Sequence, residues 1–391
     1  MTLVSKIWER TIGFIPREGF FFDRPLLILH SDDWGRAGLR DQEGFDRLKA
    51  SGLTLGERPH DLYTLETAED LWALNAVLAR HCDATGRPAV LVMNFVMANL
   101  DLPQPPRTDA MPHFLPLADG LPSGWIRPGL MEAYREGIGA GLFYPALHGM
   151  SHFCRPAVER HVGDGGERGA LLQTLWRAGT PYIYWRMPWI GYEYWDPEQA
   201  PDARFLSRCV QKESIGQAVG LFARAFSCLP RSACAPGYRA NDDTRRGWSE
   251  YGICCAQNGS SAPVAPHLDR HGILQIYRNV EFEAASGNSF SFEASLLAAE
   301  QAFSLGVPAV VSVHSINFHS TVRDFRSHTL QQLDEFLRAL KARHPDLLYV
   351  HDEDLYHLVQ GGSDALHAGL KHVKVERRRF RKPALRSREQ E

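Results

Sequence analysis

The sequence lacks the features that mark membrane, secreted and disulfide-rich proteins. No apolar run approaches the roughly 18 residues needed to span a bilayer. The first ten residues lack the basic start, apolar centre and small-residue cleavage site of a secretory signal. The seven cysteines show no paired spacing typical of a disulfide framework, and Cys254 and Cys255 lie in an apolar stretch. We therefore expect a cytoplasmic protein with reduced thiols and no transmembrane segment.

An excess of charge of one sign is also missing. The 43 Lys and Arg residues nearly balance 46 Asp and Glu residues, so the net charge of −3 gives no reason to expect a nucleic-acid partner. The glycines at 163–166 form an ordinary flexible turn and not a phosphate-binding loop. With 391 residues and 44% hydrophobic content, the chain can bury a sizeable core in one large domain or two.

What the sequence does contain is a series of short apolar runs that end in polar residues. A continuous apolar run before a turn is typical of a strand buried on both faces, as in a parallel sheet. Helical segments are expected between these runs, at 41–50 and after an N-cap at Thr67. The expected strands are the run from Leu26 to the Asp32-Asp33 pair, 88–95, 143–147, 232–235, 251–255, 273–277, 307–313 and 347–350. About eight strands with intervening helices predict an α/β fold of the (β/α) barrel class.

This pattern also predicts the domain boundaries. Residues 1–24 are expected to form a lead-in, 25–360 the barrel, and 361–391 a basic tail. Periodicity is lost over about 155–230, which we interpret as an insertion. The tail carries nine Lys and Arg against three Glu from position 371 onward, and it is either a solvated end or a contact for anionic surfaces.

Two groups of side chains stand where α/β folds keep their active sites, at the carboxyl ends of strands. Asp32 and Asp33 follow the first apolar run. Adjacent carboxylates in such a place cost repulsion and desolvation unless a positive charge sits beside them. The alternative is that one Asp caps the next helix and its neighbour is solvated.

The second group is His148 and His152, which follow the strand expected at 143–147. Two imidazoles four residues apart on a helix share one face and chelate a divalent metal. Gly149 stands where the zinc-protease helix motif needs Glu, so that motif is excluded. Two ordinary surface histidines are the alternative. A carboxylate with two imidazoles suits Zn²⁺ or a similar ion and leaves positions open for water.

Two further features contribute candidate ligand contacts. The segment 182–195 is the most aromatic of the chain and includes Trp185 and Arg186, which either stack on a sugar or base or bury the insertion against the main body. Arg239 follows the strand at 232–235 and either pairs with Asp32 or a substrate anion or is solvated.

Taken in order, four motifs resemble those of the polysaccharide deacetylases with the NodB-homology fold, carbohydrate esterase family 4. They are Ser31-Asp-Asp-Trp-Gly35, His148-x-x-x-His152, Ala235-Pro-Gly-Tyr-Arg239 and Val311-Ser-Val-His314. The resemblance covers roughly 24–357, without the insertion and the tail, and implies a NodB-like distorted (β/α)7-8 barrel. In the family an Arg precedes the Pro-Tyr pair, whereas here Arg239 follows Tyr238.

The resemblance implies a role for each motif residue. It makes Asp33, His148 and His152 the ligands of a divalent metal, and Zn²⁺ is the metal expected. Asp32 is then the general base and His314 the acid that protonates the departing amine, with an Asp from the 352–354 region orienting His314. A backbone N–H near Tyr238 would stabilise the oxyanion. Arg239 is expected to tune the base, and the expected substrate contacts are Trp34, Tyr238, Trp185, Arg186 and Asn317.

The activity implied by the resemblance is metal-dependent removal of an N-acetyl group from an amino sugar or glycan intermediate. Two alternatives stay open: another C–N hydrolase on the same fold, acting on a formylated or cyclic amide, and a carbohydrate-binding relative without catalysis. The retention of both Asp residues and three motif histidines argues against the binding protein, which has no need for an ionised pair beside imidazoles.

Overall fold

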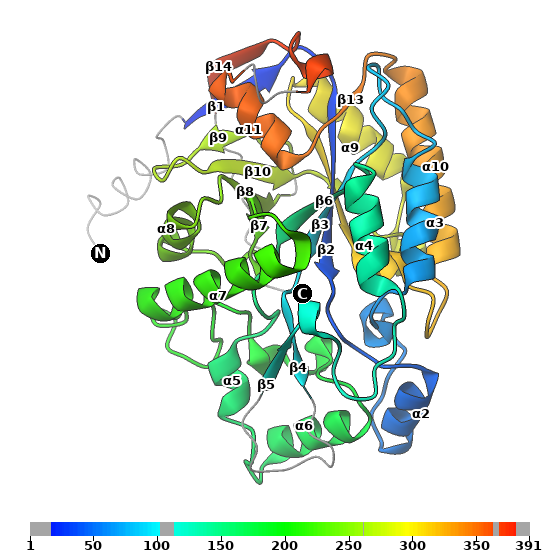
Figure 1. Ribbon diagram of the computed structural model, residues 1–391, viewed down its shortest axis with the longest axis vertical. Coiled ribbons are helices and arrows are strands. Elements are labelled where there is room, and N and C mark those ends of the chain that lie inside the picture. The colour runs from blue at the N-terminus through cyan, green and yellow to red at the C-terminus, as the bar shows by residue number, and fades with distance from the viewer. Residues whose placement is uncertain (1–16, 102–112, 261, 363–366, 381–391) are drawn as a thin grey trace, which may run out of the picture.

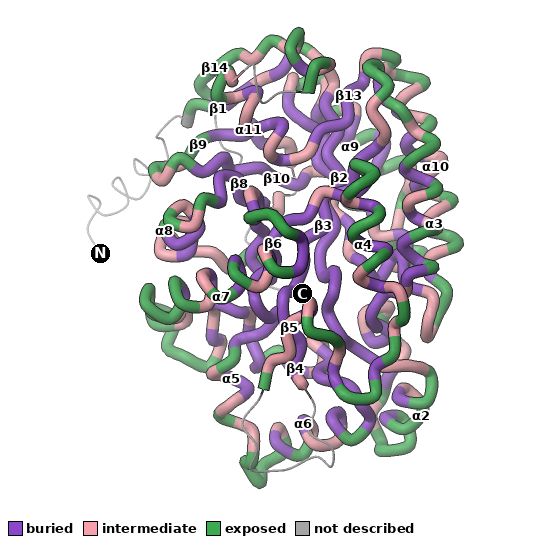
Figure 2. Tube along the Cα trace, viewed as in Figure 1, coloured by how far each residue is buried: buried purple, intermediate pink, exposed green. Residues whose placement is uncertain are grey.

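The computed structural model describes residues 17–101, 113–260, 262–362 and 367–380. A largely parallel sheet forms its centre, and the helices lie on the outside (Figure 1). Along the strands the chain is buried, while the outer faces of the helices are exposed (Figure 2). The central strands are β2 (Leu26–Trp34), β3 (Leu91–Phe95), β6 (Phe143–Leu147), β7 (Ser232–Cys234), β8 (Cys255–Gly259), β9 (His267–Leu268), β10 (Leu274–Arg278), β11 (Val280–Glu281), β12 (Ala309–His314) and β13 (Leu348–Tyr349).

The order of strands in this sheet is β11-β12-β2-β3-β6-β7-β8-β10-β9, with β13 also paired to β2. Every pairing is parallel except that of β9 with β10. Only Asn279 separates β11, the first strand in this order, from β10, the last of its parallel strands. The α/β class is thus confirmed, and the closed barrel remains our interpretation of the strand order.

The helices follow the strands as the sequence pattern predicts for most of the chain. Thr67 caps α3 together with Asp70, as the sequence predicted, and Asp41, expected as the start of a helix, is the N-cap of α2. The prediction of a strand at 251–255 is wrong except for its last residue. Tyr251 is the C-cap of helix α8, and β8 begins only at Cys255. The helices are α2 (Gln42–Ala50), α3 (Ala68–Leu78), α4 (Leu130–Gly139), α5 (Arg155–Glu159), α6 (Glu167–Arg177), α7 (Arg208–Phe226), α8 (Asp242–Glu250), α9 (Phe292–Ser304), α10 (Arg326–Arg343) and α11 (Asp352–Gln360).

The segment expected as an insertion contains regular structure. Helix α7 has 19 residues and lies between β6 and β7 in the chain, as a crossover helix of a parallel sheet does. The expected loss of periodicity is therefore wrong for this part. Its buried face includes Ala218 and Ala225 beside Ile215 and Phe222, and such small residues weaken the apolar pattern by which a helix is recognised.

The two ends of the described chain pair with each other. Strand β1 (Arg17–Phe22) runs antiparallel to β14 (Val375–Phe380), and Phe20 and Phe22 are buried. The pair lies at the opposite end of the molecule from α6 (Figure 1). Part of the expected solvated tail is thus a strand, while residues 1–16 and 381–391 fall outside the described residues. A separate hairpin joins β4 (Ala98–Asp101) and β5 (His113–Pro116).

Membrane-spanning helices are absent from the part of the chain that the structure describes, since no helix there is both long and apolar enough.

Candidate functional site

The end of β2 places two neighbouring carboxylates in one pocket. Successive side chains of a regular strand point to opposite faces. Here the pairing of β2 with β3 is irregular between Ser31 and Trp34, and Asp33 has a φ of 74°. Asp tolerates this left-handed conformation better than most residues. As a result both Asp32 and Asp33 line the pocket, and Trp34 turns into the core.

Asp33 faces the two histidines of the loop after β6. Its Oδ1 lies 3.5 Å from His148 Nε2 and 3.2 Å from His152 Nε2, and all three residues are buried. Asp33 Oδ1 has no hydrogen-bond partner of good geometry. Three ligand atoms within 4.8 Å of one another thus converge on a common point.

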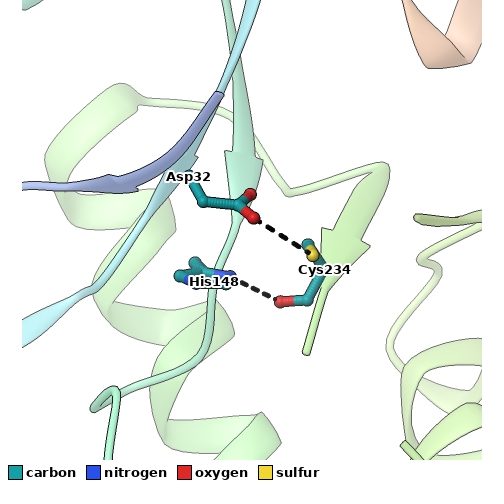
Figure 3. A group of neighbouring side chains, drawn as sticks. All are labelled: Asp32, His148 and Cys234. Atoms are coloured by element: carbon teal, nitrogen blue, oxygen red, sulfur yellow. Dashed lines mark hydrogen bonds between the residues drawn. The ribbon is translucent and has the colours of Figure 1, made fainter. Parts of the chain in front are cut away.

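The protonation of the histidines suits a cation at that point. His148 Nδ1 donates to the carbonyl of Cys234 at 2.8 Å, because a carbonyl only accepts (Figure 3). Its Nε2 is the nitrogen that faces Asp33. Burial lowers the pKa of His152 to about 4, so its imidazole is neutral. Burial also lowers the pKa of His148, but the charge of Asp32 and the contacts with Asp33 and Cys234 outweigh it and raise this pKa, so Nε2 also carries a proton when no cation is bound. A metal cation would displace that proton and take over the charge compensation.

These residues fit a divalent metal of the Zn²⁺ type. A carboxylate and two imidazoles, one with its second nitrogen fixed by a carbonyl, form the kind of donor set that catalytic zinc sites use. Burial would raise the pKa of Asp33, but Arg36 and His152 hold it well below its usual range, so the carboxylate is ionised. Asp32, His148 and Cys234 form a second close group (Figure 3). Burial raises the pKa of the Cys234 thiol, which makes it a poor ligand.

The loop that carries both histidines is supported by Glu193. Glu193 Oε1 accepts from the backbone N–H of Met150 at 3.0 Å and from Ser214 Oγ at 2.5 Å. Gly149 has a φ of 83°, and a Cβ there would overlap Glu193 Oε2. Burial raises the pKa of Glu193 to about 7. The expected insertion therefore supplies a carboxyl group that fixes the histidine loop.

Asp32 is held in a different way, by a full set of donors. Arg278, the last residue of β10, donates from Nη1 to Oδ2 at 2.6 Å and from Nη2 to Oδ1 at 2.5 Å. Asn94 donates to Oδ1 at 2.8 Å. Burial would raise the pKa of Asp32, but Arg278 and His148 hold it far below its usual range. The expected pairing of Arg239 with Asp32 is wrong, because the Arg239 guanidinium instead stacks on Trp195 at 4.6 Å.

A buried polar network continues from Asp32 through the interior of the sheet. Gln257 accepts from Arg278 Nη2 at 2.8 Å and donates from Nε2 to Asn94 at 3.0 Å and to Asp352 at 2.9 Å. Asp352 also bonds to His30 Nε2 at 2.6 Å. The charged groups at both ends fix which way the Gln257 amide points, since Arg278 only donates and an ionised Asp352 only accepts.

His314, the last residue of β12, is held by a carboxylate that the sequence pattern did not predict. His314 Nδ1 lies 2.6 Å from Glu283 Oε1, and Asn317 donates to Glu283 Oε2 at 2.6 Å. Burial would lower the pKa of His314, but Glu283 outweighs it and raises this pKa to about 9. An Asp from 352–354 does not fill this role, because Asp352 pairs with His30 and Asp354 with Arg87.

The pocket above these residues has a volume of about 140 Å³. It is lined by Asp32, Asp33, Arg36, His60, Tyr63, His148, His152, Tyr182, Ile183, Tyr184, Tyr192, Gly237, Tyr238 and His314. His314 and Asp32 are partners in the pairing of β12 with β2, so they stand side by side at one edge of the pocket. This geometry places a proton acceptor and a protonated imidazole around the candidate metal ligands.

The expected substrate contacts divide into one group at the pocket and one away from it. Tyr238 lines the pocket and is 40% exposed. Trp34 does not, because it is fully buried and stacks on Phe318. Arg186 pairs with buried Asp61 at 2.9 Å, and Asn317 is buried behind Glu283. The side chain of Trp185 lies outside those that the structure describes.

The backbone N–H groups of Tyr238, Arg239 and Ala240 are not free to act as the expected oxyanion donor in this conformation. The N–H of Tyr238 donates to Ala235 at 2.8 Å, that of Arg239 to Pro236 at 3.1 Å, and that of Ala240 to Tyr238 at 3.1 Å. These bonds close the turn after β7, so the three amides are occupied within the turn itself.

In the comparisons with known proteins, this chain is similar to others in structure only. No family model matches the chain, and no curated protein sequence matches it. Similar solved structures include polysaccharide deacetylases, family 4 carbohydrate esterases, an allantoinase and a family 4 pseudoenzyme. A probable polysaccharide deacetylase from Pseudomonas aeruginosa PAO1 is 12% identical, with 87% of this chain and 92% of that chain covered and a TM-score of 0.47. A family 4 carbohydrate esterase from Streptomyces lividans, in complex with acetate, is 11% identical, with coverage of 84% and 92% and a TM-score of 0.36. A family 4 acetyl xylan esterase from Clostridium thermocellum, with cobalt, is 11% identical, with coverage of 86% and 92% and a TM-score of 0.34.

Proposed function

We propose that this protein is a metal-dependent hydrolase that removes an N-acetyl group from an amino sugar or glycan intermediate. The observation that carries the proposal is the convergence of Asp33, His148 and His152, with Asp32 and His314 beside them at the rim of the same pocket. The four motifs that resemble family 4 carbohydrate esterases support it. Two of the residues expected to act lack their expected partners: Arg278 takes the place of Arg239 beside Asp32, and Glu283 takes the place of an Asp from 352–354 beside His314.

Different side chains of this protein have different roles in amide hydrolysis. Asp33, His148 and His152 would hold the metal, which when bound lowers the pKa of water toward about 7 and polarises a carbonyl. Asp32 takes the proton from the attacking water, while Arg278 and Asn94 hold its carboxylate in place. His314 gives its proton to the nitrogen as the C–N bond breaks, and Glu283 keeps that imidazole protonated. The products are acetate and an amine.

Metal content of the purified protein tests the proposal directly. We expect one equivalent of zinc or a similar ion in the wild type and in the control His328→Ala, whose exposed histidine lies on α10. We expect none in His148→Ala. Metal-loaded wild type should then release acetate from an N-acetylated amino sugar, and His148→Ala should not. No metal in any of the three proteins, even after incubation with Zn²⁺, contradicts the proposed mechanism.

The same metal site would serve a formylated or cyclic amide, so the acyl group needs its own experiment. A panel of N-acetyl, N-formyl and cyclic amide substrates, followed as acid or amine release, separates the three reactions. Turnover of a cyclic amide without acetate release would replace the deacetylase assignment while retaining the metal. Ligand binding with no metal-dependent product at all would favour the carbohydrate-binding alternative.

A further inference from the structure

The shape of the pocket restricts the substrate to something small near the reacting bond. Its volume of about 140 Å³ is close to that of a cavity that holds one benzene molecule, about 150 Å³. Tyr182, Tyr184 and Tyr192 of the expected insertion form one wall, and Tyr63 and Tyr238 belong to the rest of the lining. A pocket of this size takes an acyl group with its neighbouring atoms.

Most charged groups at the pocket already have a counter-charge. Arg278 makes two short hydrogen bonds to Asp32, at 2.5 and 2.6 Å. His314 has Glu283 at 2.6 Å. Each of these two pairs is electrically neutral, so neither carries a net charge that would attract a charged ligand.

Arg36 is different among the described residues that line the pocket. It is only 6% exposed, and its guanidinium lies 3.7 Å above the ring of Tyr63 and donates to the Tyr182 hydroxyl at 3.1 Å. Its one carboxylate neighbour is Asp33, at 3.4 Å, which is longer than a charge-assisted hydrogen bond. Arg36 is thus held in place by neutral rings and shares its counter-charge with the candidate metal site.

A metal at that site would leave Arg36 with too little negative charge around it. The negative charge of Asp33 would then be divided between a divalent cation and a buried guanidinium. Buried charges are costly without a partner, and guanidinium groups bind carboxylate and phosphate in preference to neutral groups. The pocket therefore has room and charge for one anionic group next to the metal ligands.

We propose that Arg36 binds an anionic group, a carboxylate or a phosphate, that the substrate carries close to the scissile amide. The substrate is then an N-acyl compound with an anionic group beside the amide and not the interior of a neutral glycan. This inference rests on the proposed function, since it assigns the substrate class of the same site.

Binding of matched probes to the zinc-loaded protein tests this. The neutral probe is N-acetylglucosamine. The anionic probes are N-acetylglucosamine 1-phosphate, with a phosphate on C1, and N-acetylmuramic acid, with the carboxylate of a lactyl ether on C3. Both substituted carbons are next to C2, which bears the acetamide. We expect wild type to bind an anionic probe about 10-fold or more tightly than the neutral one by calorimetry. The better of the two anionic probes identifies the group.

The variant Arg36→Met should lose this preference and bind the neutral probe as wild type does. The control Arg239→Met removes a guanidinium that stacks on Trp195 outside the pocket lining, and it should keep the preference. Equal affinity for all probes in wild type overturns the inference, as does a preference that persists in Arg36→Met. Loss of zinc from Arg36→Met also overturns it, because Arg36 would then only support Asp33. If zinc binds but no probe releases acetate, the proposed function fails while the affinities still decide the role of Arg36.

Discussion

The half of the site around Asp32 and the half around Asp33 differ sharply, although the two residues are adjacent. Both oxygens of Asp32 accept hydrogen bonds, from Arg278 and Asn94. Asp33 has one oxygen that faces two imidazole nitrogens and has no hydrogen-bond partner. A carboxylate with both oxygens hydrogen-bonded is fixed in position, whereas one that faces two imidazole nitrogens without a hydrogen-bond partner is arranged to receive a cation. The difference supports the proposed roles, proton transfer for Asp32 and metal binding for Asp33.

Exchanging each carboxylate for an amide should produce the largest difference between the two halves of the site. We expect Asp33→Asn to lose both metal and activity. Asp32→Asn should keep the metal and lose about 10²- to 10⁴-fold in kcat, the usual contribution of a general base. Metal analysis and acetate release of both variants measure this. If Asp32→Asn loses the metal and Asp33→Asn keeps it, the two roles are reversed.

The pH dependence tests the proton donor on the neighbouring strand. Glu283 raises the pKa of His314 to about 9, so the imidazole is protonated at neutral pH and loses its proton as the pH rises through that value. Activity should therefore fall above about pH 9. In Glu283→Gln this alkaline limb should move down toward the ordinary histidine pKa of about 6.5, with a loss of about 10-fold or more in kcat at pH 8. An unchanged alkaline limb would show that Glu283 does not control His314.

The smallest expected effect comes from the interior network behind Asp32. Gln257→Met keeps the side chain's size but removes an acceptor of Arg278, so Asp32 and Arg278 should be less well held. We expect kcat to fall about 10-fold, in line with the loss of one hydrogen bond to a charged group, with KM nearly unchanged. The control on the neighbouring strand β10 is Gln275→Met, whose buried amide bonds to Asp269 and Asn258. Equal losses of kcat in both variants would show that the network contributes to stability in general and has no specific effect on catalysis.

The sequence predicted the Asp33 half of the site better than the Asp32 half. His148 and His152 are four residues apart and follow an apolar run, so their proximity is a local property of the chain. Arg278 and Glu283 are single charged residues that only the strand order brings to Asp32 and His314. One signal was present: Arg278 follows the strand expected at 273–277, at the kind of strand end where polar residues gather. The rotation of Trp34 into the core was not predictable, because it depends on the irregular pairing at Asp33.

The pairing of β1 with β14 also has a consequence for the synthesis of the chain. Phe22 lies opposite Val375, so β1 leaves the ribosome more than 350 residues before its partner does. At about 5–20 residues per second, this delay is on the order of 20 to 70 seconds. During that time Phe20 and Phe22 lack part of their final surroundings, and an unpaired apolar strand edge invites association with other chains. Slow translation or a chaperone that binds extended apolar segments would therefore affect the yield of this protein more than its final stability.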